Sequence, residues 1–241
     1  MNQPESLTRK PPVMLRSFGR RHGRVLREWE VDLFRDVLPK VQLTLPPQEA
    51  TIDLGTLLPN AQQWWLEIGF GSGEHLSAQA ALHPDIGFIG CEPFDKGVAK
   101  LLRDVRAVPL SNVSVFMDDA RLLLDRLPDA VLDRVFILFP DPWPKQRHHK
   151  RRLVQRALLV KLARTLRQGG ELRMVSDHPD YVAWMLEVMQ HEPCFSWTAN
   201  QPEDFLQEPT DWVPTRYQQK TMQQGRQPTF LLYRRNALPA A

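Results

Sequence analysis

Short apolar runs alternate with amphipathic segments of helical period over most of the chain, from residue 64 onward. The predicted strands are WWLEIG (64–69), IGFIGCE (86–92), NVSVFM (112–117), DRVFILF (133–139), ELRMVS (171–176) and TFLLYRR (229–235). The predicted helices cover residues 72–83, 95–107, 120–127, 151–168 and 179–190, the fourth being ended by Gly169 and Gly170. This alternation predicts a doubly wound α/β fold, in which helices cover both faces of a mostly parallel sheet. Ligands of such sheets bind at the carboxyl ends of the strands.

The region before the first predicted strand has a different character. Residues 1–23 are polar, basic and contain proline and glycine, which predicts a flexible N-terminal arm. Residues 24–38 predict an amphipathic helix, since apolar side chains recur there at every fourth position: Val25, Trp29, Leu33 and Val37. We therefore expect a basic arm followed by a single domain over residues 24–241.

The net charge of +3 hides two strongly basic stretches. Residues 1–27 and residues 145–156 each carry a net charge of +6, leaving −9 for the rest of the chain. Such segregation favours a basic surface that binds a polyanion such as nucleic acid over an ordinary solvated face.

Composition excludes several classes of protein. The longest apolar runs have the length of strands and fall short of a membrane span, and the polar N-terminus does not resemble a secretory signal. The two cysteines, Cys91 and Cys194, form neither a disulfide framework nor a metal-binding cluster, and the scattered histidines predict no metal site. We therefore expect a cytoplasmic protein without membrane or metal.

A glycine-rich turn follows the first predicted strand. Glu67 precedes Gly69, Gly71 and Gly73, and the second predicted strand ends in Glu92, an acid placed to accept hydrogen bonds from ribose hydroxyls. The spacing is G-x-G-x-G, whereas dinucleotide-binding turns usually have G-x-G-x-x-G and hold a pyrophosphate. Negative charge beside the turn suits a cationic nucleoside, and S-adenosylmethionine carries both a sulfonium and an ammonium group.

This segment resembles the E-x-G-x-G-x-G motif of Rossmann-like class I methyltransferases. The resemblance implies that Glu67 and the glycine turn face the methionine end of S-adenosylmethionine, and that Glu92 faces the ribose. It also implies that Asp119, after the third predicted strand, contacts the adenine amino group. The alternative interpretation of Asp119 is a helix N-cap, and the two roles are compatible.

A proline-rich loop, Phe139–Lys145, follows the fourth predicted strand and leads into the basic run 145–156. Three prolines stiffen this loop, so that Asp141 is held at the edge of the expected donor pocket. Trp143 offers a flat face for a base, and the basic run can bind phosphates. The alternative is a rigid turn with Trp143 as a core anchor.

The string F-P-D-P-W-P-K-Q-R-H-H-K-R-R resembles the signature segment of bacterial tRNA (guanine-N7-)-methyltransferases. Three further segments match: Arg16-Ser17-Phe18 with Arg20-Arg21 in the arm, Ser176-Asp177, and Thr215-Arg216-Tyr217-Gln218. The resemblance implies that Asp141 is the acid of the catalytic site, where it contacts the donor, the guanine or both. It implies substrate binding by Lys145, Asp177, Thr215, Arg216, Tyr217 and Gln218.

Two positions depart from the family pattern. Gln218 stands where glutamate is frequent, so a role that needs a carboxylate there is in doubt. Arg216 stands where the pattern has lysine, and it keeps the positive charge while adding a planar fork of donors.

The implied reaction is methylation of guanine N7 in tRNA by S-adenosylmethionine, at the guanosine of the variable loop. N7 carries a free lone pair, so no strong general base is required. The alternatives are a methyltransferase that acts on another RNA, a protein or a small molecule, and a non-catalytic RNA-binding module. The glycine spacing disfavours a nicotinamide oxidoreductase. The sequence leaves open whether the protein is a monomer or a homodimer.

Overall fold

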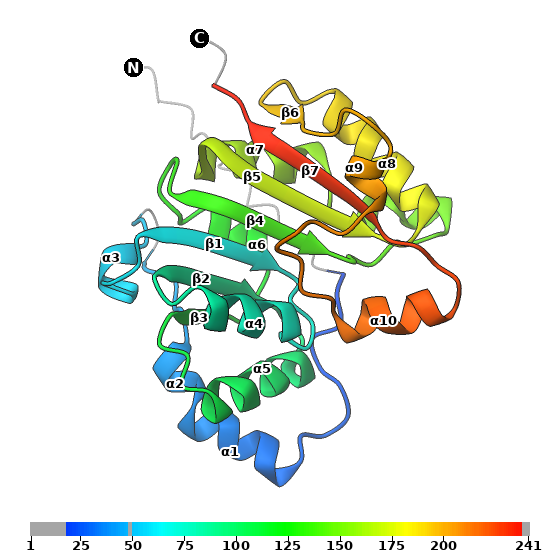
Figure 1. The fold of residues 1–241 in the computed structure, drawn as a ribbon. Coiled ribbons are helices and arrows are strands. Elements are labelled where there is room, and N and C mark those ends of the chain that lie inside the picture. Colours follow the sequence, from blue (N-terminus) through cyan, green and yellow to red (C-terminus); the bar gives the residue numbers. More distant parts are fainter. Residues whose placement is uncertain (1–17, 48–49, 238–241) are drawn as a thin grey trace, which may run out of the picture.

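The computed structural model describes residues 18–47 and 50–237, and its centre is a seven-stranded sheet in the order β3-β2-β1-β4-β5-β7-β6 (Figure 1). The strands are β1 (Gln63–Ile68), β2 (Ile86–Cys91), β3 (Val113–Phe116), β4 (Leu132–Leu138), β5 (Leu166–Ser176), β6 (Phe195–Trp197) and β7 (Thr229–Arg235). All neighbouring strands pair in parallel except β7, which is antiparallel to both β5 and β6. The predicted doubly wound, mostly parallel sheet is therefore confirmed.

Helices lie on both faces of the sheet (Figure 1). Their bounds are α1 (Glu28–Asp36), α2 (Leu38–Val41), α3 (Leu54–Leu57), α4 (Glu74–Leu82), α5 (Asp95–Ala107), α6 (Ala120–Leu124), α7 (Arg156–Thr165), α8 (Pro179–Gln190), α9 (Glu203–Leu206) and α10 (Arg216–Gln223), with a 3₁₀ turn η1 (Gln146–Arg151). One apolar core joins α1, α4 and α5 to the sheet, and a second joins α6, α7 and α8 to the opposite face. The carboxyl ends of the parallel strands are thus left to the connecting loops.

The N-terminal helix is shorter than the sequence predicts. It begins only at Glu28, because the Arg27 backbone N–H donates to Glu30 Oε2 at 2.6 Å and so closes a capping turn. Leu33 and Val37 are buried as expected, whereas Val25 lies outside the helix and is 92% exposed.

The predicted helix 151–168 is wrong at both ends. The helix α7 begins at Arg156, after the η1 turn, and the chain enters β5 at Leu166, which pairs with Leu132 of β4. Gly169 and Gly170 therefore lie inside a strand rather than after a helix. Strand pairing at the sheet has overridden a local helical period here.

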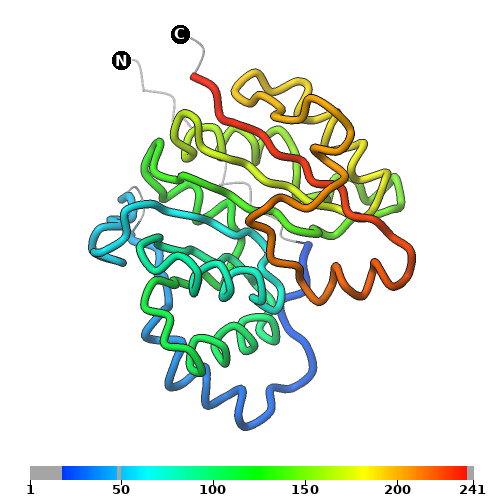
Figure 2. Tube along the Cα trace, in the orientation of Figure 1, coloured from blue at the N-terminus to red at the C-terminus, as the bar shows by residue number. Residues whose placement is uncertain are grey.

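The segment between β6 and α10 is the part whose path the sequence did not predict. It crosses in front of the strands before it enters α10, as the orange part of the tube in Figure 2 shows. β6, α9 and α10 are short and were not predicted, because segments of three to eight residues carry little periodic signal. This crossing brings the late T-R-Y-Q element to the carboxyl ends of the strands.

Candidate active site

The glycine turn after β1 requires glycine for its backbone conformation. Gly69, Gly71 and Gly73 have φ angles of 75°, 56° and 78°, which side chains rarely tolerate. A Cβ atom on Gly73 would also lie 2.8 Å from Leu101 Cβ of α5. The turn is therefore fixed both by its own dihedral angles and by the helix packed behind it.

A fourth glycine, Gly97 in the first turn of α5, was not among the predicted site residues. A Cβ atom there would stand 2.1 Å from the carbonyl oxygen of Gly71. No side chain fits into that space, so Gly97 allows α5 to approach the turn closely. A glycine inside an otherwise well-formed helix is the sequence signal that could have pointed to it.

Glu92 follows β2 and connects that strand to the turn. Its carboxylate accepts hydrogen bonds from the backbone N–H of Gly71 and of Phe94, both at 2.9 Å. Burial raises the pKa of Glu92, the two N–H donors oppose this, and the charges of Asp141 and Glu67 raise it further. The strand ends therefore carry a concentration of negative charge.

A cavity of about 480 Å³ opens at the carboxyl ends of β1, β2, β3 and β4. Its lining includes five of the residues predicted to bind the donor: Gly69, Gly71, Glu92, Asp119 and Asp141. Phe18, Gly19 and Arg20 from the end of the predicted arm also line it. The structure thus brings acids from three separate strand ends to one hollow.

Glu67 and Gly73 are absent from the lining of this cavity. Glu67 is buried, and its Oε2 lies 2.7 Å from His75 Nδ1 on α4. The His75 ring in turn packs on Phe136 and Trp212. The partner of Glu67 in the described residues is therefore a histidine that the sequence did not single out, and its role toward the donor stays a prediction.

Asp119 is the N-cap of α6, which confirms one of the two interpretations given for it. Its carboxylate accepts from the Arg121 backbone N–H at 3.0 Å and forms an ion pair with the Arg121 guanidinium at 2.6 Å. Burial would raise the pKa of Asp119, but the bonds from Arg121 hold it below its ordinary value. Asp119 therefore stays ionised at the cavity wall.

The loop Phe139–Lys145 has an unusual backbone. Phe139 and Trp143 adopt φ angles of 49° and 44°, although neither is glycine, and they flank Asp141. Such residues cost about 1–3 kcal/mol each and persist only where the surroundings hold them. Asp141 itself is exposed at the cavity edge, and Trp143 is partly buried beneath the Arg151 guanidinium, 4.9 Å from its ring.

The basic run 145–156 does not behave as one surface. Lys145, Arg147 and Lys150 are exposed, as a phosphate-binding role requires. Arg152 is buried, so the prediction that the whole run binds phosphates is wrong at this position. The physical reason is that Asp180, at the start of α8, and the carbonyl of Pro142 supply partners for its guanidinium within the protein.

The predicted substrate residues Asp177 and Tyr217 lie together. The Tyr217 hydroxyl donates to Asp177 Oδ1 at 3.3 Å, and Arg226 pairs with the same carboxylate at 3.0 Å. The Tyr217 ring packs on Phe139, with centroids 5.1 Å apart. Residues far apart in the sequence thus meet beside the Asp141 loop, and Arg226 joins them although no sequence signal pointed to it.

The rest of the T-R-Y-Q element shapes the chain around this contact. Thr215 caps α10 by accepting from the Gln218 backbone N–H, and Arg216 pairs with Glu74 at 3.1 Å. The Gln218 side chain is 0% exposed, accepts from Trp212 Nε1 at 2.8 Å and donates to Glu208 at 2.6 Å. The oxygen and the nitrogen of the Gln218 amide therefore both form hydrogen bonds inside the protein. No exposed atom of this side chain is left for the predicted contact with the substrate.

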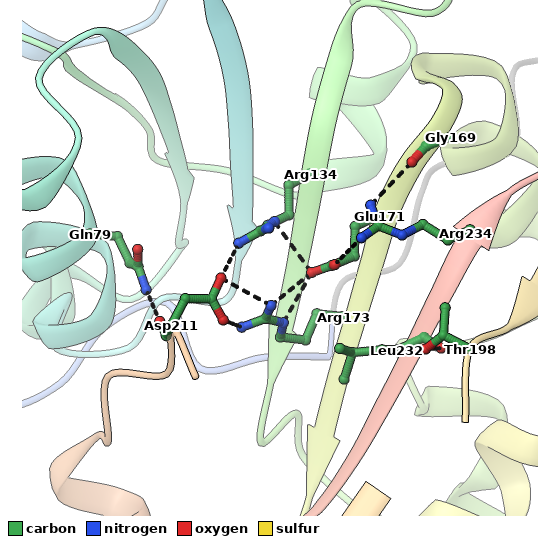
Figure 3. A network of polar contacts seen from close by, with 9 residues as sticks. All are labelled: Gln79, Arg134, Gly169, Glu171, Arg173, Thr198, Asp211, Leu232 and Arg234. Atoms are coloured by element: carbon green, nitrogen blue, oxygen red, sulfur yellow. Dashed lines mark hydrogen bonds and ion pairs between the residues drawn. The ribbon is translucent and has the colours of Figure 1, made fainter. Parts of the chain in front are cut away.

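A network of ion pairs fixes the crossing segment on the sheet (Figure 3). The Asp211 carboxylate pairs with Arg134 of β4 at 2.5 Å and with Arg173 of β5 at 2.9 Å. Glu171 of β5 pairs with both arginines and with Arg234 of β7. Burial would raise the pKa of Asp211, but the two arginines lower it to about 2.

The end of the predicted arm lies against the domain. Arg21 forms an ion pair with Asp118, and the backbone N–H of Gly23 donates to Asp95 at 3.2 Å. The predicted family residues Arg16 and Ser17 lie outside the described residues, so the division into an arm of residues 1–23 and a domain from residue 24 stays a prediction.

Solved structures share this architecture. A 16S rRNA methyltransferase, KamB, aligns with a TM-score of 0.56 at 14% identity, covering 80% of this chain and 95% of that chain. The antibiotic-resistance methyltransferase Kmr aligns with a TM-score of 0.52 at 18% identity, covering 77% and 92%. Together with the sheet order and the cavity beside the glycine turn, this likeness defines the fold of a class I S-adenosylmethionine-dependent methyltransferase.

Comparison with known sequences identifies the family within this class of methyltransferases. A family model described as "Putative methyltransferase" matches residues 61–231. The tRNA (guanine-N(7)-)-methyltransferase of Rhodospirillum rubrum is 46% identical over 229 residues, covering 94% of this chain and 90% of the relative. That of Paramagnetospirillum magneticum is 48% identical over 224 residues, covering 92% and 93%. The chain belongs to the tRNA (guanine-N7-)-methyltransferase family.

Proposed function

We propose that this protein transfers the methyl group of S-adenosylmethionine to N7 of a guanine in tRNA, at the guanosine of the variable loop. One observation carries the proposal: the loop Phe139–Lys145 joins two sites. Asp141 lines the acidic cavity, while Phe139 packs on Tyr217 beside Asp177. Family membership supports the reaction, and the loop geometry supports the residues assigned to it.

The cavity suits a cationic nucleoside. Glu92 and Asp141 line it and repel one another, and positive charge from the ligand would offset that repulsion, whereas Asp119 is already paired with Arg121. Glu92 is held by two backbone N–H groups, which orient its carboxylate at the end of β2 to accept from ribose hydroxyls. We assign Glu92, Asp119 and the glycine turn to donor binding on this basis.

The reaction requires that the donor methyl group and guanine N7 be aligned, and it requires no general base. The donor supplies a methyl group on a sulfonium sulfur, and the lone pair of guanine N7 forms the new N–C bond as the S–C bond breaks. No proton moves in this step, and the positive charge passes from sulfur to the base. Asp141, exposed at the cavity edge, stabilises that charge or binds the guanine edge.

The target guanine has to be accessible. N7 lies in the deep, narrow groove of A-form RNA, which side chains do not read, so a guanine in a loop or one pulled from its stack is required. A loop guanosine meets this need, and the exposed cations Lys145, Arg147 and Lys150 lie next to the Asp141 loop to bind phosphates. From this substrate we infer that the reaction takes place in the cytoplasm. Among the described residues, no helix combines the length and apolarity needed to cross a bilayer.

The test is a methylation assay with mapping. The protein is incubated with isotope-labelled S-adenosylmethionine and unmodified tRNA transcripts, and nucleosides from position-specific digests are identified by mass spectrometry. We expect 7-methylguanosine in the variable loop, and none in a transcript whose variable-loop guanosine is replaced by adenosine. Label in another nucleoside would support a methyltransferase with a different RNA target. Tight tRNA binding without any label would support a non-catalytic RNA-binding module.

A further inference from the structure

One arginine of the basic run points inward. Arg152 follows Arg151 and precedes Leu153, and in the sequence nothing separates it from its charged neighbours. Its side chain is nevertheless only 1% exposed, although it lies at the wall of the donor cavity. A guanidinium that is so enclosed is not accessible to a phosphate of the tRNA. Its role therefore rests on its contacts within the protein.

Arg152 contacts both the proline-rich loop and the helix α8. Its Nε donates to the carbonyl oxygen of Pro142 at 2.9 Å, and its Nη2 forms an ion pair with Asp180. The guanidinium also lies 5.0 Å from the centre of the Tyr181 ring and 5.1 Å from that of Trp184. A single planar group thus links the proline loop to three side chains of α8.

The frame that holds Arg152 is itself well fixed. The Val154 backbone N–H donates to the Tyr181 hydroxyl at 3.2 Å, and Trp184 Nε1 donates to the Val154 carbonyl at 2.8 Å. Gln155 Nε2 donates to the Arg152 carbonyl at 2.8 Å. Both the backbone and the guanidinium of Arg152 are therefore tied in place, and α8 supplies most of the ties.

Pro142 lies beside both the acid of the proposed catalytic site and a strained residue. Pro142 directly follows Asp141 and precedes Trp143, one of the two left-handed non-glycine residues in the loop. A strained turn of this kind relaxes unless neighbouring groups hold it. The bond from Arg152 holds the carbonyl of the peptide group that joins Pro142 to Trp143, directly after Asp141.

We propose that Arg152 is a positioning residue for Asp141, which it serves by fixing the Pro142 carbonyl from α8, and that it binds no tRNA phosphate. The proposal rests on the proposed function, because it concerns the acid assigned to that reaction. Lysine cannot replace it, since one ammonium group lacks the planar fork that donates to a carbonyl and a carboxylate in different directions.

The test compares Arg152→Gln with Arg147→Gln, an exposed arginine of the same run as the matched control. Single-turnover methylation at saturating tRNA and donor, the Kd of S-adenosylhomocysteine, and the Kd of tRNA as a function of salt are measured for both. We expect Arg152→Gln to lower the single-turnover rate about 100-fold, as a misplaced catalytic group does. We expect its S-adenosylhomocysteine Kd to stay within about twofold and its salt slope to equal that of the unaltered protein.

The control should behave in the opposite way. Loss of a phosphate contact lowers the slope of log K against log salt by roughly 0.7–0.9, and we expect this lower slope for Arg147→Gln. A lowered slope with an unchanged rate in Arg152→Gln would overturn the proposal in favour of a phosphate contact. Loss of S-adenosylhomocysteine affinity in proportion to the rate would overturn it in favour of a donor contact.

A second variant covers the case in which Arg152→Gln does not fold. Asp180→Asn removes the ion-pair partner of Arg152 at a side chain that is 55% exposed, so folding should persist. We expect a smaller loss of single-turnover rate, about three- to tenfold, with donor affinity and salt slope unchanged; an unchanged rate would count against the proposal. If the unaltered protein makes no 7-methylguanosine, the proposed function fails, whereas an active protein with an unaffected Arg152→Gln rate defeats the positioning role alone.

Discussion

The two sides of the candidate active site are held by different kinds of interaction. On the donor side, the glycine turn and Glu92 are joined by backbone N–H groups, and the turn is fixed by its own dihedral angles and by the α5 backbone packed against it. On the acceptor side, the Asp141 loop, Asp177 and α10 are joined by contacts of side chains from distant segments, such as Tyr217 with Asp177 and Arg152 with Asp180. The donor side thus rests mainly on backbone geometry, and the acceptor side on contacts between side chains.

This difference predicts that substitutions on the two sides separate cleanly. Changes to the turn should impair donor binding, and changes to the ion-pair network should impair tRNA methylation while donor binding persists. Four experiments test this separation, beginning with the largest expected effect.

Asp141→Ala should abolish most turnover, by about 100- to 1,000-fold, because it removes the carboxylate placed where charge develops. The Kd of S-adenosylhomocysteine should rise by less than about fivefold. Single-turnover rates and calorimetric titrations measure the two quantities, with the exposed Asp36→Ala as the control. Equal losses of rate and of donor affinity would assign Asp141 to the donor side instead.

Gly97→Ala should impair the donor side alone, by weakening the binding of S-adenosylhomocysteine. A Cβ atom 2.1 Å from the Gly71 carbonyl forces α5 away from the turn, and we expect at least a tenfold weaker Kd for S-adenosylhomocysteine. Gly55→Ala is the matched control, since its Cβ atom would meet a side-chain oxygen of Asp53 at 3.3 Å. Donor affinity unchanged by Gly97→Ala would mean that the turn tolerates movement of the helix behind it.

Asp211→Asn should weaken the acceptor side. It leaves Arg134 and Arg173 without one of their carboxylates, and we expect a loss of about 1–3 kcal/mol in the free energy of unfolding and a several-fold lower kcat/KM for tRNA. Because the pKa of Asp211 is lowered to about 2, its stabilising effect is complete above about pH 4 and disappears as the pH falls through 2. Denaturation of both proteins at pH 7 and pH 3 measures this, and a stability difference that grows on acidification would contradict it.

Gln218→Glu should have the smallest effect, roughly 1–2 kcal/mol of stability, because it sets a carboxylate against Glu208, to which the Gln218 amide now donates at 2.6 Å. The double variant with Glu208→Gln restores a donor and acceptor pair and should recover most of the loss. Thermal unfolding of the two single variants and the double variant forms the required cycle. Additive losses would show that the Gln218 amide is not coupled to Glu208.

Much of the donor side could be predicted from sequence, and the acceptor side only in part. The glycine spacing, Glu92 and the N-cap interpretation of Asp119 follow from strand ends and local turn chemistry, and the structure places all of them at one end of the sheet. Asp177 and Tyr217 were grouped by family resemblance, but their contact depends on a segment whose path was not predicted. Arg226 and the Asp211 network carried no signal, because an ion pair leaves no periodic pattern in a sequence.

The sequence by itself determined the alternation of the main strands and helices, the glycine turn and the stiff loop that carries Asp141, because these depend on periodicity and on the dihedral angles of neighbouring residues. Only the tertiary structure decided which charges turn inward. Arg152 became internal, and Gln218 was buried, through partners 28 and 10 residues away. The physical reason is that burying a charged or polar side chain is favourable only where a partner satisfies it, and the fold alone brings such partners into reach.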